Sequence, residues 1–206
     1  MQPELIALLV VSLALLLFLA VRPSVTRGPG GRALAFLGVF LLPGITLFAG
    51  FEQHMESSKT KQFCMTCHVM RDYGKSLMVD DNEYIPAVHY QNNYVPREKA
   101  CFTCHTDYAM YGDLRAKLRG LRHLYVQYVG TVPDTIKLYT PFQNRECLHC
   151  HGESRKFLAN SGHHDDDTTM VAMQSGRLSC MASGCHDVAH DVHELKGAPM
   201  WSEGTK

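Results

Sequence analysis

The sequence has no excess of charge of either sign. Its 206 residues include 20 lysine and arginine residues and 20 aspartate and glutamate residues, so the formal net charge is zero. Without a basic stripe that could neutralise phosphates, no feature of the chain indicates nucleic-acid binding. Beyond residue 52 the sequence also lacks the alternation of apolar and polar residues that marks a sheet. The absence of this pattern predicts a mainly α fold.

No cysteine lies outside four short motifs. In three of them, two residues separate the cysteines and a histidine follows directly, while in the fourth the separation is four residues. The motif cysteines and histidines are Cys64, Cys67 and His68; Cys101, Cys104 and His105; Cys147, Cys150 and His151; and Cys180, Cys185 and His186. A disulfide framework would have no use for a histidine after every second cysteine, and paired zinc sites would not require one.

This order of residues matches covalent attachment of c-type haem. Two thiols reach the two vinyl groups of one porphyrin, and the histidine after the second thiol rises under the iron. In the longer fourth motif the loop between the cysteines must bulge, which the small residues Ala182, Ser183 and Gly184 allow. The alternatives are paired zinc sites for the first three motifs and an unrelated thiol at Cys180. The sequence predicts four covalently bound haem c groups.

Two long apolar runs precede the motifs. Residues 5–21 and 33–51 carry no charged side chain, and each run approaches the length of about 20 residues that spans a bilayer as a helix. Residues 22–32 between them hold three arginines and no acidic residue, which is typical of a loop on the cytoplasmic side. The first four residues lack the positive charge of a signal peptide, so the first run is interpreted as a retained span, with cleavage as the alternative.

These features predict three segments: residues 1–32 as the first transmembrane helix with its loop, 33–51 as the second, and 52–206 as a periplasmic tetrahaem domain of short helices and loops. Pro43-Gly44 inside the second span should kink its helix. The strongest helix signal in the third segment covers residues 111–129, where Leu114, Leu118 and Leu121 recur at helical spacing among basic residues. Such a basic helix could lie on an anionic membrane, contact haem propionates or present a solvated face.

The chain has twelve histidines, and the motifs use four. A six-coordinate haem needs a second axial ligand, usually histidine or methionine. The candidates beyond the last motif are His190 and His193, and the pair His163 and His164 is a second source. His149, inside the third motif, is interpreted as a surface residue.

The motifs Phe63-Cys64-Met65-Thr66-Cys67-His68-Val69-Met70 and Arg145-Glu146-Cys147-Leu148-His149-Cys150-His151, behind an N-terminal anchor, resemble those of the membrane tetrahaem quinol dehydrogenases of the NapC/NirT family. Within this family the chain is most similar to the NrfH branch, the small subunit of cytochrome c nitrite reductase. The resemblance covers about residues 35–195. The second transmembrane run and the longer fourth motif depart from the family pattern.

The resemblance carries implications for single residues. Met70 occupies the position of an axial methionine of the first haem, with ligation by His68 as the alternative. His89 matches a histidine that reaches the third haem. The family histidine that ligates the second haem corresponds to His190 or His193, which the altered spacing leaves undecided. Near the quinol, Lys117 matches a family lysine, and His123 stands at the position of an acidic residue.

By this resemblance the chain is expected to oxidise quinol at a bacterial inner membrane, with its haem domain on the periplasmic face. Electrons would pass to a periplasmic multihaem cytochrome or reductase, with a nitrite reductase-like catalytic subunit as the expected partner. The alternative is a non-catalytic relay and anchoring subunit of a larger complex in which another subunit oxidises the quinol. Because all four motifs end in histidine, the chain is not expected to be a terminal reductase by itself.

Overall fold

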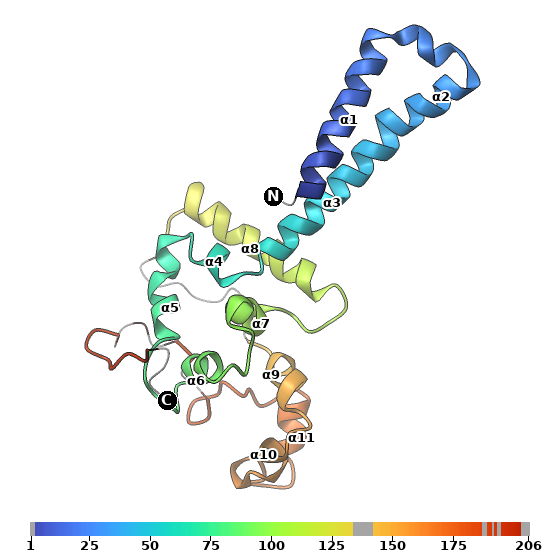
Figure 1. Cartoon of the computed structure of the whole chain (residues 1–206). Coiled ribbons are helices and arrows are strands. Elements are labelled where there is room, and N and C mark those ends of the chain that lie inside the picture. The colour runs from blue at the N-terminus through green and yellow to red at the C-terminus, as the bar shows by residue number, and fades with distance from the viewer. Residues whose placement is uncertain (1–2, 134–141, 187–188, 191, 193–194, 203–206) are drawn as a thin grey trace. The chain divides into compact units, whose positions relative to one another are not determined.

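The computed structural model describes residues 3–133, 142–186, 189–190, 192 and 195–202. Within these residues the regular structure is helical, and the β structure is limited to one isolated antiparallel bridge between Val79 and Met200. The chain divides into two compact units, Met1–Lys59 and Thr60–Lys206 (Figure 1). The mainly α fold predicted from the sequence is confirmed.

The first unit is a helical hairpin. Its elements are α1 (Pro3–Val21), the 3₁₀ helix η1 (Pro23–Arg27), α2 (Pro29–Phe36), the π-helical turn η2 (Leu37–Leu41) and α3 (Leu42–Ser57). The last three form one continuous helix over residues 29–57, which extends beyond the predicted span at both ends. In the described part of the chain, α1 and this long helix are the two helices long and apolar enough to cross a membrane. Phe40 and Leu47 remain 67% and 75% exposed, as side chains that face lipid would be.

The sequence predicted a kink at Pro43, and the structure has a π turn directly before this proline. Proline has no backbone N–H to donate to the preceding turn. Here the N–H of Leu42 donates to the Leu37 carbonyl, five residues back, so the extra residue of the π turn is accommodated just before the proline. The helix therefore continues past Pro43 instead of ending there.

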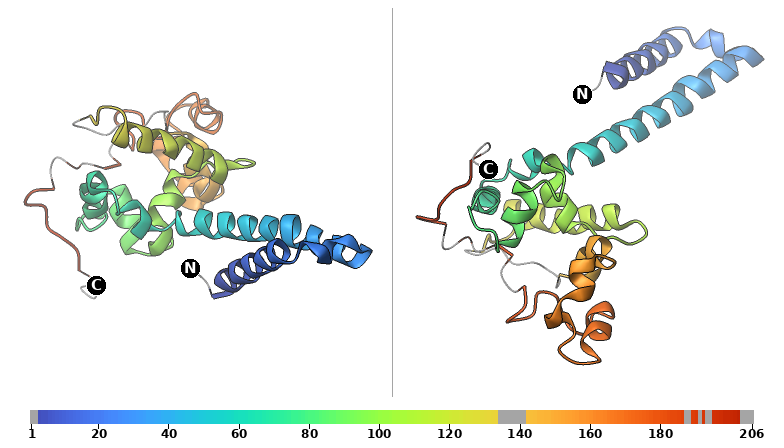
Figure 2. Two further views of the ribbon diagram at one scale, coloured as in Figure 1. Left: turned by 90° about the horizontal axis from the view of Figure 1, so that it is seen from above. Right: turned by 60° about the horizontal axis from the view of Figure 1, so that its bottom comes forward.

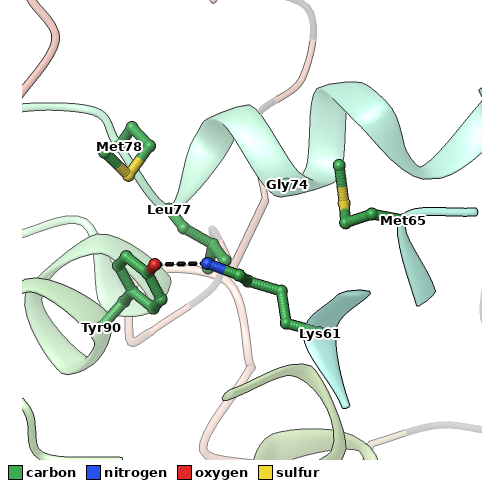
Figure 3. Close-up of a pocket in the computed structure, with 6 residues that line it drawn as sticks. All are labelled: Lys61, Met65, Gly74, Leu77, Met78 and Tyr90. Carbon is green, nitrogen blue, oxygen red and sulfur yellow. Dashed lines mark hydrogen bonds between the residues drawn. The ribbon is translucent and has the colours of Figure 1, made fainter. Parts of the chain in front are cut away.

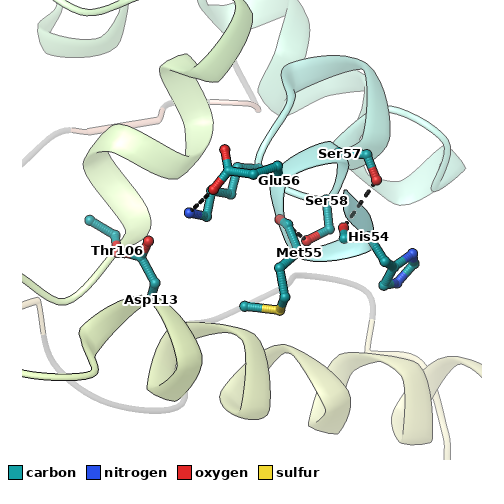
Figure 4. A network of polar contacts seen from close by, with 8 residues as sticks. His54, Met55, Glu56, Ser57, Ser58, Thr106 and Asp113 are labelled. Carbon is teal, nitrogen blue, oxygen red and sulfur yellow. Dashed lines mark hydrogen bonds and ion pairs between the residues drawn. The ribbon is translucent and has the colours of Figure 1, made fainter. Parts of the chain in front are cut away.

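The two helices of the hairpin pack closely at Gly38. A Cβ atom at this position would lie 2.8 Å from Cδ1 of Leu19 and 3.0 Å from Cγ of Leu15, so a larger residue would require these leucine side chains to shift. At the other end of the long helix, two serines secure the last turn (Figure 4). The Ser57 hydroxyl donates to the His54 carbonyl at 3.0 Å, and the Ser58 hydroxyl donates to the Met55 carbonyl at 2.8 Å.

The second unit consists of short helices joined by turns (Figures 1 and 2). Its elements are α4 (Lys61–Cys64), η3 (His68–Met70), α5 (Arg71–Ser76), α6 (Ile85–Gln91), η4 (Arg97–Lys99), α7 (Ala100–His105), α8 (Gly112–Tyr128), α9 (Asn144–His151), α10 (Arg155–Ala159), η5 (Ser161–His163) and α11 (Thr169–Gln174). The helix predicted over residues 111–129 is confirmed as α8. It is the longest helix of the unit among the described residues.

The buried apolar cluster of the second unit is small. It contains Leu77, Tyr90, Val95, Ala100 and Trp201, with Met78 and Cys104 packed against it. Trp201 comes from the C-terminal segment, whose backbone is fixed by a 2.7 Å hydrogen bond from the Trp201 N–H to the Met78 carbonyl. This bond and the bridge between Val79 and Met200 return the end of the chain to the segment that follows α5.

Candidate functional site

The motif cysteines and histidines lie on short helices or tight turns. The first motif runs from the end of α4 into η3, the second occupies α7, and the third occupies the end of α9. The fourth motif is a loop in which the His186 N–H donates to the Cys180 carbonyl at 3.1 Å, and Gly184 adopts a left-handed φ of +82°. The bulge expected from the longer spacing is therefore present, and it brings the ends of the motif together.

The cysteines of successive motifs are neighbours. The Cys101 thiol donates a hydrogen bond to Cys64 and is the main cause of the low pKa of Cys64, about 7. The same arrangement joins the third and fourth motifs, where Cys147 donates to Cys180 and lowers its pKa to about 7. Between the second and third motifs, burial raises the pKa of Cys104 and the charge of Cys150 adds to this effect. The four motifs therefore follow one another in space in their order along the chain.

Three motif histidines each face one histidine from elsewhere in the chain. The ring centres of His105 and His190 are 6.1 Å apart, those of His151 and His89 are 5.8 Å apart, and those of His186 and His163 are 6.4 Å apart. An iron bound by two imidazoles at about 2 Å on each side would separate the ring centres by about 6 Å. All three separations fit an iron between the rings.

The ring nitrogens of the non-motif histidines also fit this role. Nδ1 of His89 donates to the Ile85 carbonyl and Nδ1 of His163 donates to the Phe157 carbonyl, both at 2.8 Å, because a carbonyl can only accept. This leaves Nε2 of each ring available to a metal, the usual state of a ligating histidine. His164 differs, since its Nε2 lies 2.7 Å from the Leu158 carbonyl. Of the two adjacent histidines, His163 is the one that combines a ring centre 6.4 Å from that of a motif histidine with an Nε2 not engaged by a carbonyl.

Loss of contact with water favours the neutral form of an imidazole ring, which is the form that binds metal. Burial, followed by the charge of His105, lowers the pKa of His190 to about 4. Desolvation also lowers the pKa of His105, with a contribution from His123, and that of His151, with contributions from His89 and His186, although both residues remain exposed to solvent. Among the described residues no three or more His, Cys, Asp or Glu side chains converge as a metal cluster would require. A pair of axial ligands needs only two side chains.

The remaining candidates for axial ligands lie near the first motif and at the end of the chain. His68 and Met70 both belong to η3, where His68 is exposed and Met70 is half-buried. His193 lies outside the described residues.

The candidate quinol residues lie on α8. The Lys117 ammonium sits 4.7 Å from the ring centre of Phe102, inside the second motif, and 5.7 Å from that of Phe63, next to the first motif. Its charge also contributes to the low pKa of Cys64. The His123 ring is exposed, yet partial desolvation and the adjacent Arg122 lower its pKa. The apolar residues Leu118 and Leu121 are 56% and 55% exposed, so α8 combines an apolar surface with both candidates.

A small cavity of about 120 Å³ lies beside the first motif (Figure 3). Its lining residues are Lys61, Met65, Gly74, Leu77, Met78 and Tyr90. The Lys61 ammonium donates to the Tyr90 hydroxyl at 2.5 Å and lies 4.6 Å from the centre of that ring. The cavity is mainly apolar, with this pair as its polar contact.

Three contacts beside the second and third motifs were not predicted from the sequence. His149 is exposed, as predicted. Its ring also stacks on that of Tyr108, with ring centres 3.9 Å apart and an interplanar angle of 10°. Asp107, whose side chain is only 2% exposed, pairs with Arg145 at 2.6 Å and with Arg115 at 3.6 Å. No local pattern marks the contacts of Tyr108 with His149 and of Asp107 with Arg145, because each joins positions far apart in the sequence.

Comparison with known proteins identifies the family. The sequence profile of the NapC/NirT cytochrome c family, N-terminal region, matches residues 31–195. The cytochrome c-type protein NapC of Haemophilus influenzae is 23% identical over 191 residues, which cover 83% of this chain and 88% of that protein. NapC of Escherichia coli K12 is 30% identical over 140 residues (61% and 66%), and the denitrification system component NirT of Stutzerimonas stutzeri is 26% identical over 194 residues (82% and 90%).

No solved structure matches the chain. The family match covers all four motifs, the three histidine pairs and α8, and membership implies covalently bound haem and a role in electron transfer. The chain belongs to the NapC/NirT family of c-type cytochromes.

Proposed function

We propose that this chain is a membrane-anchored tetrahaem cytochrome c that oxidises quinol, with menaquinol as the expected form, and delivers the electrons to a partner protein. The observations that carry the proposal are the series of four motifs and the three histidine pairs, whose ring centres lie 5.8 to 6.4 Å apart, a separation that fits an iron between them. Haem, when bound, supplies reversible one-electron sites, and a continuous series of them can conduct electrons from one end of the unit to the other.

The residues of this chain would hold each haem by two thioether bonds from the motif cysteines and by two axial ligands. For the second, third and fourth motifs we assign the axial pairs His105 with His190, His151 with His89, and His186 with His163. Their separations of 5.8 to 6.4 Å and the free Nε2 atoms of His89 and His163 support these pairs. For the first motif we assign Met70, by the resemblance to the NrfH branch, with His68 as the alternative.

The quinol site is proposed at α8, next to the first motif. Lys117 bridges the aromatic residues beside the first two motifs, and it can bind the oxygen of a quinol head group as a hydrogen-bond donor. His123 lies almost two turns further along the same helix, and its lowered pKa keeps the ring neutral and able to accept a quinol proton. The exposed leucines of α8 offer an apolar surface for the quinone ring.

We further propose that α1 and the helix over residues 29–57 both cross the bacterial inner membrane. The three arginines between the two apolar runs favour a cytoplasmic loop, which would put residue 60 onward on the periplasmic face. Covalent haem attachment takes place on that face. The acceptor would then be a periplasmic or membrane-associated multihaem protein, with a nitrite reductase-like catalytic subunit as the expected partner.

Removal of the two α8 side chains tests the quinol site. In purified protein in detergent, Lys117→Ala and His123→Ala are each expected to slow haem reduction by a menaquinol analogue by about 100-fold. A rate loss of this size is typical when a residue that transfers a proton or orients the substrate is removed. Arg119→Ala, an exposed basic residue of the same helix, serves as the control and is expected to keep the wild-type rate. Stopped-flow absorption measures the rates, and reduction by dithionite shows whether the haems are intact.

The competing function gives a different result in the same experiment. A relay subunit that receives electrons from another quinol-oxidising subunit has no quinol site to lose. Equal rates for Lys117→Ala, His123→Ala and wild type would therefore reject the proposed site and favour the relay role.

A further inference from the structure

Ser76, the last residue of α5, is completely buried, and its hydroxyl lies 2.8 Å from Nδ1 of His190. The two residues are 114 positions apart in the chain. The contact therefore joins the start of the second unit to the histidine that follows the last motif. Unlike a surface serine, Ser76 has no access to water that could replace this partner.

The direction of the hydrogen bond follows from the other contact of the hydroxyl. Ser76 Oγ donates its hydrogen to the Tyr73 carbonyl at 2.7 Å, one turn earlier in α5. Its oxygen is then an acceptor for His190, so the histidine carries its proton on Nδ1 and its Nε2 is unprotonated, and the centre of this ring lies 6.1 Å from that of His105. His89 and His163 have the same tautomer, but their Nδ1 atoms donate to backbone carbonyls. His190 alone among these three relies on a side chain.

The position of Ser76 is fixed from several directions. The Gln91 side chain donates to the carbonyls of Leu77 at 3.2 Å and Val79 at 2.6 Å. The Trp201 N–H donates to the carbonyl of Met78, which lies between them. All three residues after Ser76 are therefore held through their carbonyl groups. Tyr73, in the same helix, also meets the His190 ring edge-on, with ring centres 5.6 Å apart.

We propose that Ser76 is a positioning residue for the haem of the second motif: its hydroxyl orients His190 towards the iron and sets the oxidation–reduction equilibrium of that haem. This inference rests on the proposed axial role of His190. An acceptor at Nδ1 makes an imidazole a stronger electron donor, and a stronger donor favours ferric iron over ferrous iron. Without the hydroxyl, the haem becomes easier to reduce.

The test is Ser76→Ala, which removes one oxygen atom and adds no volume to the buried site. The expected result is a rise in the midpoint potential of one of the four haems by about 59 mV, which corresponds to a tenfold change in its one-electron equilibrium. A tenfold change is at the lower end of the range seen when a hydrogen-bond partner of a metal ligand is removed. The g values of one low-spin haem should also change. Redox titration followed by absorption and electron paramagnetic resonance (EPR) spectroscopy measures both quantities.

Two further variants separate the possible outcomes. Ser58→Ala removes another buried serine with the same hydroxyl-to-carbonyl bond three residues back, and should leave all four potentials unchanged. His190→Ala should convert one haem to high spin. If His190→Ala does so but Ser76→Ala shifts no potential, the role of Ser76 is rejected and the ligation by His190 stands. If neither change alters any haem, the axial assignment of His190 fails as well.

Discussion

Replacement of His163 by alanine is expected to convert one haem from low spin to high spin, whereas the same change at the adjacent His164 should leave all four haems unaltered. His163 faces the motif histidine His186 at 6.4 Å and donates from Nδ1 to a carbonyl, which leaves Nε2 for iron. His164 engages its Nε2 with the Leu158 carbonyl instead. Without His163 the iron would keep one axial ligand, and five-coordinate iron with a single histidine is high spin.

The spin states can be read from the ferric absorption and EPR spectra of the two purified variants. Haem content should stay at four per chain in both, because the thioether bonds from the cysteines do not depend on the second axial ligand. A high-spin haem in His164→Ala, or none in His163→Ala, would reverse the assignment. Corresponding variants of His89 and His190 extend the test to the third and second motifs.

Replacement of Trp201 by alanine is expected to lower the free energy of unfolding of the second unit by about 3–5 kcal/mol, the usual cost of removing a buried tryptophan side chain. Trp201 is 8% exposed and belongs to the small cluster with Leu77, Tyr90 and Val95. The Arg97 guanidinium lies 5.2 Å from the centre of its ring. Among the described residues of this unit few other apolar side chains are buried, so the lost contacts are not easily replaced.

Met200 provides the matched control for this prediction. It is the preceding residue and contributes to the bridge with Val79 through its backbone, but its side chain is 49% exposed. Met200→Ala should therefore change the stability by no more than about 0.5 kcal/mol. Urea unfolding in detergent, followed by circular dichroism, compares the two variants. Equal effects would mean that Trp201 does not anchor the C-terminal segment.

Features with a local signature could be predicted from the sequence. The two apolar helices follow from charge-free runs of sufficient length, and α8 follows from leucines at helical spacing. The motifs specify the kind of cofactor because each is complete within a few residues. The helix over residues 29–57 is longer than the span predicted over residues 33–51. Polar residues can extend a helix beyond the apolar part that marks a span, so the apolar run does not predict where the helix ends.

The histidine pairs could not be predicted in the same way. His163 and His164 have the same chemical identity and adjacent positions, and only the local turn decides which nitrogen each one presents. The position of His190 depends on Ser76 and on the return of the C-terminal segment to the residues after α5. These contacts depend on tertiary packing over long sequence separations, for which no periodicity or spacing gives a signal.

The most direct test of the proposed function is the reduction of the purified, fully haem-loaded protein in detergent by a menaquinol analogue, followed in the haem absorption bands. We expect that all four haems are reducible by dithionite and that the quinol analogue reduces this protein without any other subunit. Haems that respond to dithionite but stay oxidised in the presence of the quinol would contradict it.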